Sequence, residues 1–556
     1  MYSLHACSTV TCLKRRASRF MRSNSEYLIP GLAVISLLTA CAIVSSKKIL
    51  WNDELLSYYL LSDASFIHML SAFHDKINNT PPLYFLLGWI WTSGFGSTPF
   101  SLRSFSSVAI GFAALTTWVS LRTVYDIHST MIAILTVFGT SPLILDQNAE
   151  ARMYGLFLAI ASLLILQFQL NNRTDAHSRG LLTSNVCING ALVQTHLFGI
   201  LYSGIFLIAQ MGFDRSRRIF RPGLYAVIVL SWVPLLFYVP SFLNQADAGS
   251  PRFWLPSPTL SIFRDFMLDT GPSRPVIPLL ALLSLVFLVT ARSRKLEGGI
   301  TKQDRRLERS LIWIACAFST IPVGVFLISS TKPLFLDKYL IPTTLVWTVF
   351  IASAAQRVIR PRLAVRGGDF VISFAALVLL AASTIYPLWA ANVVAQQAPP
   401  GSQDARYGYE KLPIVVQFSH DFVTRLYYSP TPNRYFFILD WSSAVDESSG
   451  LFPPQEYKQV EALKRQYPRV FQNVIQGETF LAMTKQFLVL TSREYDRKCP
   501  IESEKRNWGD NIQCPQWVAK RLLTDPKYTI QLLGEIEPGV LLLVENSESK
   551  PERANR

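Results

Sequence analysis

Residues 28–46 read LIPGLAVISLLTACAIVSS, an apolar run of the length that crosses a lipid bilayer. Directly after this run comes Trp51-Asn52-Asp53-Glu54, which places two adjacent carboxylates beside an apolar segment. Similar apolar runs recur up to residue 390. The chain of 556 residues is 50% hydrophobic and only 16% charged, with a mean hydropathy of +0.26. This composition argues against a single water-soluble enzyme domain and against an intrinsically disordered chain.

The apolar pattern predicts about eleven membrane-spanning helices. We expect them near residues 28–46, 104–121, 129–145, 153–170, 181–196, 198–213, 223–242, 276–291, 311–329, 339–356 and 370–390. Residues 81–96 (PPLYFLLGWIWTSGFG) are also apolar, but they begin with two prolines and contain three glycines. Trp89 and Trp91 in this stretch are typical of a membrane interface. We therefore interpret 81–96 as a helix that lies at the membrane surface or dips into it.

The distribution of charge tests this topology. The chain has 53 Lys and Arg against 38 Asp and Glu, a formal net charge of +15. With a cytoplasmic N-terminus and no span at 81–96, the cytoplasmic segments hold 23 basic and 8 acidic residues, whereas the opposite loops before residue 391 hold 10 of each. This asymmetry follows the positive-inside rule and accounts for the net charge, so no nucleic-acid partner is needed to explain it.

The same reading divides the chain into three parts. Residues 1–27 form a basic cytoplasmic tail and residues 28–390 a membrane domain. Residues 391–556 carry 20 basic and 20 acidic residues, and short strand-like runs such as Tyr435–Leu439 and Val540–Val544 alternate with polar stretches. This pattern predicts a small extracytoplasmic α/β domain. We therefore expect a multi-pass plasma (inner) membrane protein with a cytoplasmic N-terminus and its C-terminal domain outside.

Two further features leave alternatives open. The first apolar run follows a basic tail and could be a signal peptide, but apolar residues continue past Cys41, which favours a signal anchor. Cys499 and Cys514 are the cysteines of the predicted external domain. They could form a disulfide in an oxidising compartment or remain two free thiols.

Charged side chains gather at the outer ends of the predicted spans. Asp53 or Glu54 could act as a general base toward a hydroxyl or amine, or the pair could simply begin a solvated helix, where acidic residues are favoured. Arg103 and Lys338 each precede a predicted span, and Arg152 lies in an outer turn. These cations could bind a lipid phosphate, or they could snorkel to the interface and balance the charge of a solvated turn.

His196 lies in another outer turn, on the same side as Asp53, although a lone histidine is more often structural than catalytic.

An acidic pair and several cations on one membrane face suit an amphiphilic substrate whose phosphate lies at the interface and whose tail stays in the lipid bilayer. The sequence contains no Walker loop, Rossmann glycine pattern, HExxH or CxxC motif, so nucleotide hydrolysis as a power source is not supported.

At these residues the chain resembles the GT-C membrane glycosyltransferases, in particular the bacterial branch related to protein O-mannosyltransferases and the lipid A aminoarabinose transferase. The resemblance covers roughly residues 28–360 and rests on the order of short motifs and their shared side of the membrane. These motifs are Asp53-Glu54, Pro81-Pro82-Leu83-Tyr84, Leu102-Arg103-Ser104, Ala151-Arg152-Met153-Tyr154 and Lys338-Tyr339-Leu340-Ile341-Pro342.

The resemblance implies an inverting transfer of a sugar from a polyprenyl-phosphate donor to an extracytoplasmic acceptor, which could be a glycan, a lipid or a protein. By resemblance, Asp53 is the general base, and Glu54 supports it or helps to hold acceptor or phosphate. The expected ligands of the departing phosphate are Arg103, Arg152 and Lys338, and the candidate substrate contacts are His196, Tyr154 and Tyr339.

Two departures from the family pattern concern the ligands. Thr80 stands where relatives often carry His before the two prolines, and Lys338 stands where Arg is common, which keeps the charge but loses the bidentate fork.

The sequence establishes no cofactor and leaves a divalent metal open. A transporter or flippase of polyprenyl-linked sugars is the alternative function; it explains the spans and cations, but not the acidic pair or the external domain. A third alternative is an inactive relative that scaffolds glycan assembly.

Overall fold

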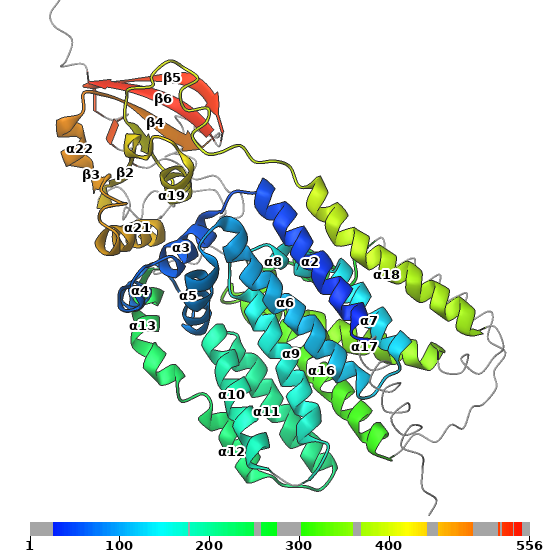
Figure 1. Cartoon of the computed structure of the whole chain (residues 1–556). Coiled ribbons are helices and arrows are strands. Elements are labelled where there is room, and N and C mark those ends of the chain that lie inside the picture. Colours follow the sequence, from blue (N-terminus) through cyan, green and yellow to red (C-terminus); the bar gives the residue numbers. More distant parts are fainter. Residues whose placement is uncertain are drawn as a thin grey trace, which may run out of the picture.

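The computed structural model describes residues 26–175, 178–248, 257–274, 302–359, 368–441, 454–492, 517, 521–522, 525–537 and 539–546. Within these residues, a long helical bundle carries a smaller domain with a β-sheet at one end (Figure 1). Most of the basic tail, the predicted span 276–291, Cys499 and Cys514 lie outside the described residues.

The bundle contains the described helices up to residue 393. They are α2 (Leu28–Lys47), α3 (Asn52–Leu61), α4 (Phe66–His74), α5 (Leu83–Phe95), α6 (Pro99–Arg122), α7 (Ile127–Thr140), α8 (Pro142–Asn148), α9 (Tyr154–Asn171), α10 (Arg179–Thr195), α11 (Gly199–Ser216), α12 (Pro222–Leu230), α13 (Leu235–Ala248), α14 (Leu260–Thr270), α16 (Lys302–Ser329), the 3-10 helix η1 (Asp337–Leu340), α17 (Thr343–Ile359) and α18 (Gly368–Val393).

The predicted polytopic helical fold is confirmed, but the count of eleven spans is not. In the described part of the chain, five helical segments are long and apolar enough to cross a bilayer, namely α2, α6, α9, α16 and the segment Pro222–Asp247 that includes α12 and α13. A sixth would be the pair α7 and α8, which is bent by 60°. Every predicted span that falls on described residues coincides with helix, yet several helices, such as α10 with 17 residues, are short.

The stretch 81–96 forms the short helix α5. With 13 residues at about 1.5 Å each, α5 is about 20 Å long, whereas the hydrocarbon core of a bilayer is about 30 Å thick. The helix is therefore too short to cross the membrane alone, in agreement with the interpretation as a surface element. Phe95 at its end is 67% exposed.

Helix α6 begins five residues earlier than the sequence predicted. The Thr98 side chain caps it by accepting a hydrogen bond from the Ser101 amide at 3.2 Å, and Pro99 occupies the first turn, where its missing N–H costs nothing. Arg103 therefore lies inside α6 and is 1% exposed, instead of preceding a span at the interface. The expectation that Arg103 lies before the helix was wrong because the cap precedes the apolar run.

The chain after α18 forms the sheet domain, a six-stranded sheet in the described residues with strand order β3-β2-β1-β4-β6-β5. Pairing is parallel from β3 to β4 and antiparallel from β4 to β5, so the predicted α/β character is confirmed. Its elements are β1 (Ile414–Val416), α19 (Ser419–Tyr428), η2 (Pro432–Arg434), β2 (Tyr435–Leu439), α21 (Pro454–Gln466), β3 (Val474–Gln476), α22 (Gly477–Met483), β4 (Gln486–Ser492), β5 (Tyr528–Ile536) and β6 (Gly539–Asn546).

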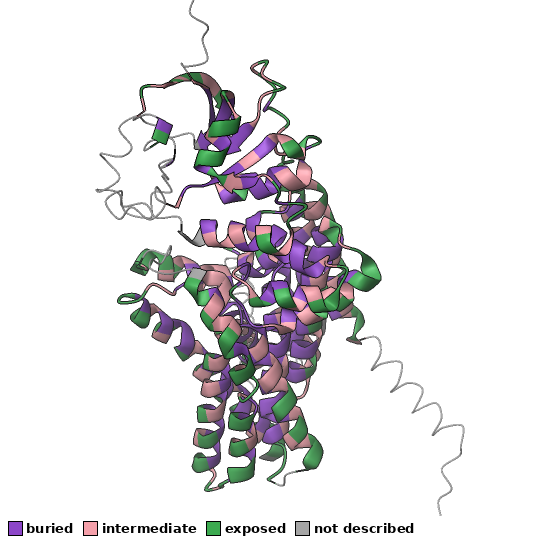
Figure 2. Cartoon of the chain, turned by 90° about the vertical axis from the view of Figure 1, so that its left-hand side faces the viewer, coloured by how far each residue is buried: buried purple, intermediate pink, exposed green. Residues whose placement is uncertain are grey.

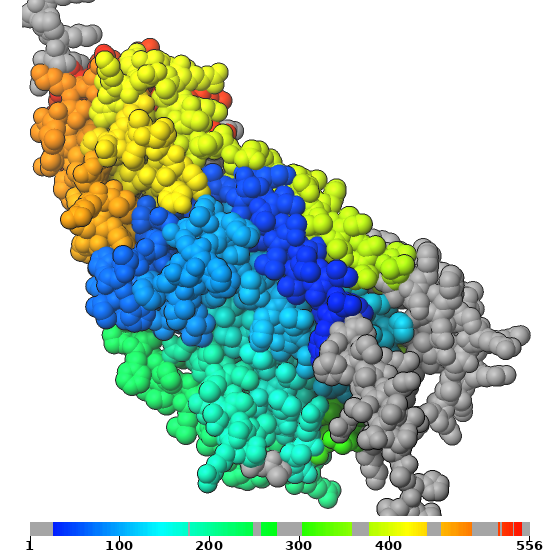
Figure 3. Space-filling view, viewed as in Figure 1, coloured from blue at the N-terminus to red at the C-terminus, as the bar shows by residue number. Residues whose placement is uncertain are grey.

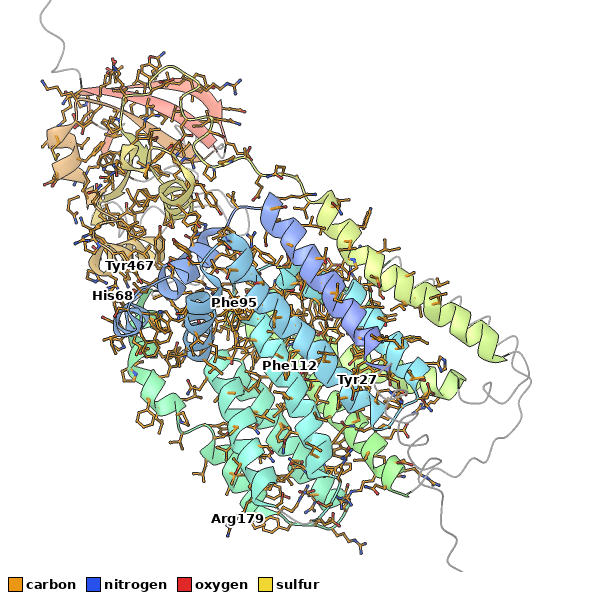
Figure 4. The ribbon with its side chains drawn as sticks, in the orientation of Figure 1. Tyr27, His68, Phe95, Phe112, Arg179 and Tyr467 are labelled. Carbon is orange, nitrogen blue, oxygen red and sulfur yellow. The ribbon has the colours of Figure 1, made fainter. Side chains whose placement is uncertain are left out.

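The sheet domain packs directly on α3 and α4. In Figure 3 the blue surface of α3 to α5 meets the yellow and orange surface of this domain. Tyr467 donates hydrogen bonds to the Tyr59 carbonyl at 2.9 Å and to Asp63 Oδ2 at 3.1 Å, and its ring lies edge-on to His68 (Figure 4). The Tyr428 hydroxyl accepts a hydrogen bond from the Leu50 amide at 2.7 Å. The domain is thus attached to the segment that leads into Asp53 and Glu54.

The opposite end of the bundle carries a buried polar network. Tyr27 and Arg179, labelled in Figure 4, lie at this end, far from the sheet domain. Asp214 and Arg221 form a buried ion pair there at 2.6 Å, and the Tyr225 hydroxyl donates to Asp214 at 2.8 Å. Buried residues run through the middle of the bundle to the sheet domain, whereas exposed residues line the outer helix faces (Figure 2).

Candidate active site

Glu54 connects the elements of the site. It lies in the first turn of α3, where its Oε2 accepts a hydrogen bond from the Trp51 amide at 3.2 Å and its Oε1 one from the Ala151 amide at 2.8 Å. Arg103 donates from Nε to Glu54 Oε1 at 2.8 Å and from Nη2 to Oε2 at 2.6 Å. Arg103 also donates to the carbonyls of Lys48 and Ile49 at 2.9 and 2.8 Å. This pair therefore joins the end of α2, α3, α6 and the turn 149–153.

Asp53 faces another direction. Its side chain is 30% exposed, whereas that of Glu54 is 1% exposed. Arg152 approaches it with an Nη2–Oδ2 distance of 3.7 Å, and Arg152 Nη1 lies 3.4 Å from both the Asp53 carbonyl and Ser57 Oγ. Burial alone would lower the pKa of Arg152, but Asp53 and the other neighbours hold it above its ordinary value. The site thus contains a partly accessible carboxylate beside a permanently charged guanidinium.

The turn 149–153 is fixed by α6. Ser106 Oγ donates to the Arg152 carbonyl, and Ser107 Oγ donates to Asn148 Oδ1, both at 2.8 Å. Gly155, in the first turn of α9, lets this helix lie close to α6. A Cβ atom at this position would lie only 2.5 Å from the Ser106 carbonyl oxygen. The close approach of these helices sets the position of Arg152 relative to Asp53.

Lys338, from η1, completes the charged part of the site. Its Nζ lies 3.4 Å from Glu150 Oε1 and over the rings of Trp51 and Tyr154, at 4.7 and 5.3 Å from their centroids. Glu150 is 9% exposed, and burial raises its pKa to about 7, although the charge of Lys338 acts in the opposite direction. Lys338 therefore lies between a carboxylate and two aromatic faces.

An aromatic cluster lies beside Arg152 and Lys338. His196 follows the end of α10, stacks on Phe157 with a centroid distance of 5.0 Å and lies 4.9 Å from the ring of Tyr339. Its Nδ1 accepts a hydrogen bond from the Phe198 amide at 3.0 Å. Burial, with the charges of Arg152 and Lys338, lowers the pKa of His196 to about 3, so the ring is neutral near pH 7. The rings of Tyr154 and Tyr339 stack at 6.2 Å.

A cavity of about 1020 Å³ is lined by Glu54, Arg103 and Glu150, whereas Asp53, Arg152 and Lys338 are not among its lining residues. The part of its lining from α2 and α18 is apolar, and other lining residues come from α8, Ala149 and Glu150. The α19 helix of the sheet domain also contributes lining residues. The lining includes Ala40, Val44, Trp51, Glu54, Arg103, Asp146, Glu150, Pro387, Ala390, His420 and Thr424. A cavity with an apolar wall beside a charged site can accept an amphiphilic molecule.

The structure brings all the predicted site residues into one region at the sheet-domain end of the bundle. Two of the purely structural explanations that the sequence left open are wrong. Arg103 is buried and does not snorkel to the interface, and the turn at Glu150 and Arg152 is buried instead of solvated. Sequence reasoning missed Glu150 as the partner of Lys338, because 188 residues separate them. The described residues contain no group of three or more His, Cys, Asp or Glu that could hold a metal ion.

The chain is similar in structure to ArnT from Cupriavidus metallidurans. For ArnT bound to undecaprenyl phosphate, the TM-score is 0.55 and the identity 12%, over 95% of this chain and 99% of that chain. For the apo state, the TM-score is 0.56 and the identity 11%, over 96% and 100%. The oligosaccharyltransferase of Archaeoglobus fulgidus tethered with an acceptor peptide gives a TM-score of 0.44 and an identity of 14%, over 85% and 70%.

No protein-family model and no curated protein matches the sequence of the chain. The likeness to ArnT nevertheless extends over almost the full length of both chains. The chain therefore has the fold of ArnT.

Proposed function

We propose that this chain is a membrane glycosyltransferase that moves a sugar from a polyprenyl-phosphate donor to an acceptor outside the cytoplasm. The observation that carries the proposal is the position of Asp53, a partly exposed carboxylate that lies with two cations, Arg152 and Lys338. The adjacent residues Glu54 and Glu150 line a cavity that is partly apolar. The fold of ArnT, whose structure includes bound undecaprenyl phosphate, supports the choice of a lipid phosphate as the leaving group.

In the proposed reaction Asp53 takes the proton from a hydroxyl or amine of the acceptor. The acceptor atom forms a bond to the anomeric carbon of the sugar while the bond from this carbon to the phosphate oxygen breaks. The electron pair stays on the phosphate, which leaves as polyprenyl phosphate, and attack from the opposite face inverts the anomeric configuration. Arg152 and Lys338 stabilise the negative charge that grows on the departing oxygen.

Glu54 and Arg103 have positioning roles in this proposal. Both oxygens of Glu54 and both ends of the Arg103 guanidinium are engaged in hydrogen bonds within the protein. A pair that is occupied in this way holds the end of α3 in place but offers little to a substrate. We therefore assign the base to Asp53 alone and the phosphate contacts to Arg152 and Lys338.

Tyr154, Tyr339 and His196 form the wall beside the cations. Because His196 is neutral near pH 7, we propose packing or a neutral hydrogen bond for it, and no transfer of a proton. In this proposal the bundle end with the sheet domain faces outside, and described residues of this domain, such as His420 and Thr424, line the cavity. The end with Asp214 and Arg221 faces the cytoplasm, as the positive-inside rule requires.

The test is an assay with the purified full chain in liposomes. A panel of undecaprenyl-phosphate sugars and candidate acceptors is supplied, and free undecaprenyl phosphate is measured. The proposal expects release that depends on the acceptor. Movement of a labelled lipid across the bilayer without cleavage of its glycosyl bond would contradict it and would favour a flippase.

A further inference from the structure

The two cations proposed to bind the donor phosphate, Arg152 and Lys338, differ in their ion-pair partners. Arg152 is paired with Asp53, the proposed base. Lys338 is paired with Glu150, a carboxylate to which the proposed reaction gives no role. The contact is a single one of 3.4 Å, unlike the bidentate pair of Glu54 and Arg103. Within the described residues, Glu150 is the ion-pair partner of Lys338.

Glu150 lies where the cavity meets the charged site. It lines the cavity together with Trp51, and Lys338 lies over the ring of Trp51. The carboxylate of Glu150 has Lys338 as its hydrogen-bond partner within the described part of the chain. An anion that enters from the cavity would bind the ammonium group of Lys338. The Glu150 carboxylate already occupies that position.

Two anions at one half-buried ammonium compete. A carboxylate and a phosphate at the same position repel each other, and this repulsion is large where the surroundings are poorly hydrated. Burial of Glu150 favours its neutral form and raises its pKa to about 7, which opposes the charged pair with Lys338. The groups that face it are Lys338 from η1, Asp146 from α8, Arg152 from its own turn and Glu54 from α3.

We propose that Glu150 occupies the anion position at Lys338 in the lipid-free protein and that a lipid phosphate displaces it. The inference rests on the proposed function and identifies a residue that sets the affinity of the site for the phosphate. Glu150 weakens the binding of the phosphate before and after transfer. Its return to Lys338 assists the release of the polyprenyl phosphate product.

The test measures the binding of undecaprenyl phosphate to the purified full chain and its variants. Lys338→Gln should weaken binding and Glu150→Gln should tighten it, each by about tenfold, as expected for one close charge pair. In the Lys338→Gln background, Glu150→Gln should change the affinity by less than about threefold, because coupled residues are not additive. Asp146→Asn is the matched control, since Asp146 lines the same cavity and is exposed. It should change the affinity by less than about threefold, because charges in water interact weakly.

Three outcomes would overturn the inference. If Glu150→Gln binds no more tightly while Lys338→Gln weakens binding, the role of Glu150 is wrong and the proposed function stands. If Asp146→Asn tightens binding as much as Glu150→Gln, the tighter binding comes from the loss of any negative charge at the cavity, and Glu150 has no specific role at Lys338. If the wild-type chain binds no lipid phosphate, the proposed function fails and the inference fails with it. Should Glu150→Gln not fold, Glu150→Asp retracts the carboxylate by one carbon and should also tighten binding.

Discussion

Glu54 and Arg103 form a bidentate ion pair between α3 and α6, with donor–acceptor distances of 2.8 and 2.6 Å and side chains at most 2% exposed. The neighbouring residue Asp53 points to the accessible side, because successive residues of a helix face directions about 100° apart. The acidic pair of the sequence thus separates into a positioning residue and a candidate base. This separation is the structural basis of the predictions below.

Breaking the pair of Glu54 and Arg103 should destabilise the protein strongly. Glu54→Gln leaves a buried guanidinium without a countercharge, which typically costs about 3–5 kcal/mol. We expect a clear loss of thermal stability in detergent, measured by the unfolding transition of the purified protein. The control is Arg264→Gln, which breaks the exposed pair with Asp265 and should cost less than about 1 kcal/mol. Equal losses in both variants would contradict the structural role of Glu54.

The sheet domain should stabilise the loop that leads into Asp53. Tyr428→Phe removes the acceptor of the buried Leu50 amide, and an unsatisfied buried donor costs about 1–3 kcal/mol. We expect faster hydrogen exchange at residues 49–52 and a lower rate of transfer, with the rest of the bundle unchanged. Unchanged exchange at these residues would show that the bond to Tyr428 does not hold the loop.

The network at the opposite end of the bundle should affect stability without affecting catalysis. Asp214 accepts hydrogen bonds from Arg221 and Tyr225 and is fully buried. Asp214→Asn should lower the thermal stability by about as much as Glu54→Gln, since both break a buried ion pair. The turnover per folded molecule should remain at the wild-type level. A large loss of turnover in folded protein would indicate that this network communicates with the site.

The stability of the lipid-free protein should depend on pH through Glu150. Its pKa is raised from 4.5 to about 7 in the folded state, mainly by burial. The contribution of this group to stability is therefore complete below pH 4.5 and is lost as the pH rises through about 7. Between pH 6 and 8, the melting temperature of the wild-type protein should fall relative to that of Glu150→Gln. Parallel curves for the two proteins would contradict the raised pKa.

The sequence was sufficient for the helical fold, the short helix within 81–96 and the grouping of the site residues. Helix α5 is short because Pro and Gly bound it. These are local properties of the chain. The separation of Asp53 from Glu54 was not predictable, because it depends on Arg103 lying opposite Glu54 in the packed bundle.

The pairing of Glu150 with Lys338 was also beyond the sequence. Glu150 has Arg152 as a close sequence neighbour, so a local charge balance was the natural interpretation. In the folded chain Arg152 turns toward Asp53, and η1 brings Lys338 to Glu150. The number of spans is not confirmed for a related reason: apolar runs identify helices buried by packing as well as helices that face lipid.

The central claim is that Asp53 is the base of a sugar transfer from a lipid phosphate. The most direct measurement is the acceptor-dependent release of undecaprenyl phosphate by Asp53→Asn, beside the wild-type protein and Asp265→Asn, which removes an exposed carboxylate of α14. We expect the release rate of Asp53→Asn to fall by about 100-fold or more, with binding of undecaprenyl phosphate retained and Asp265→Asn unaffected. Release by Asp53→Asn at the wild-type rate would contradict the account.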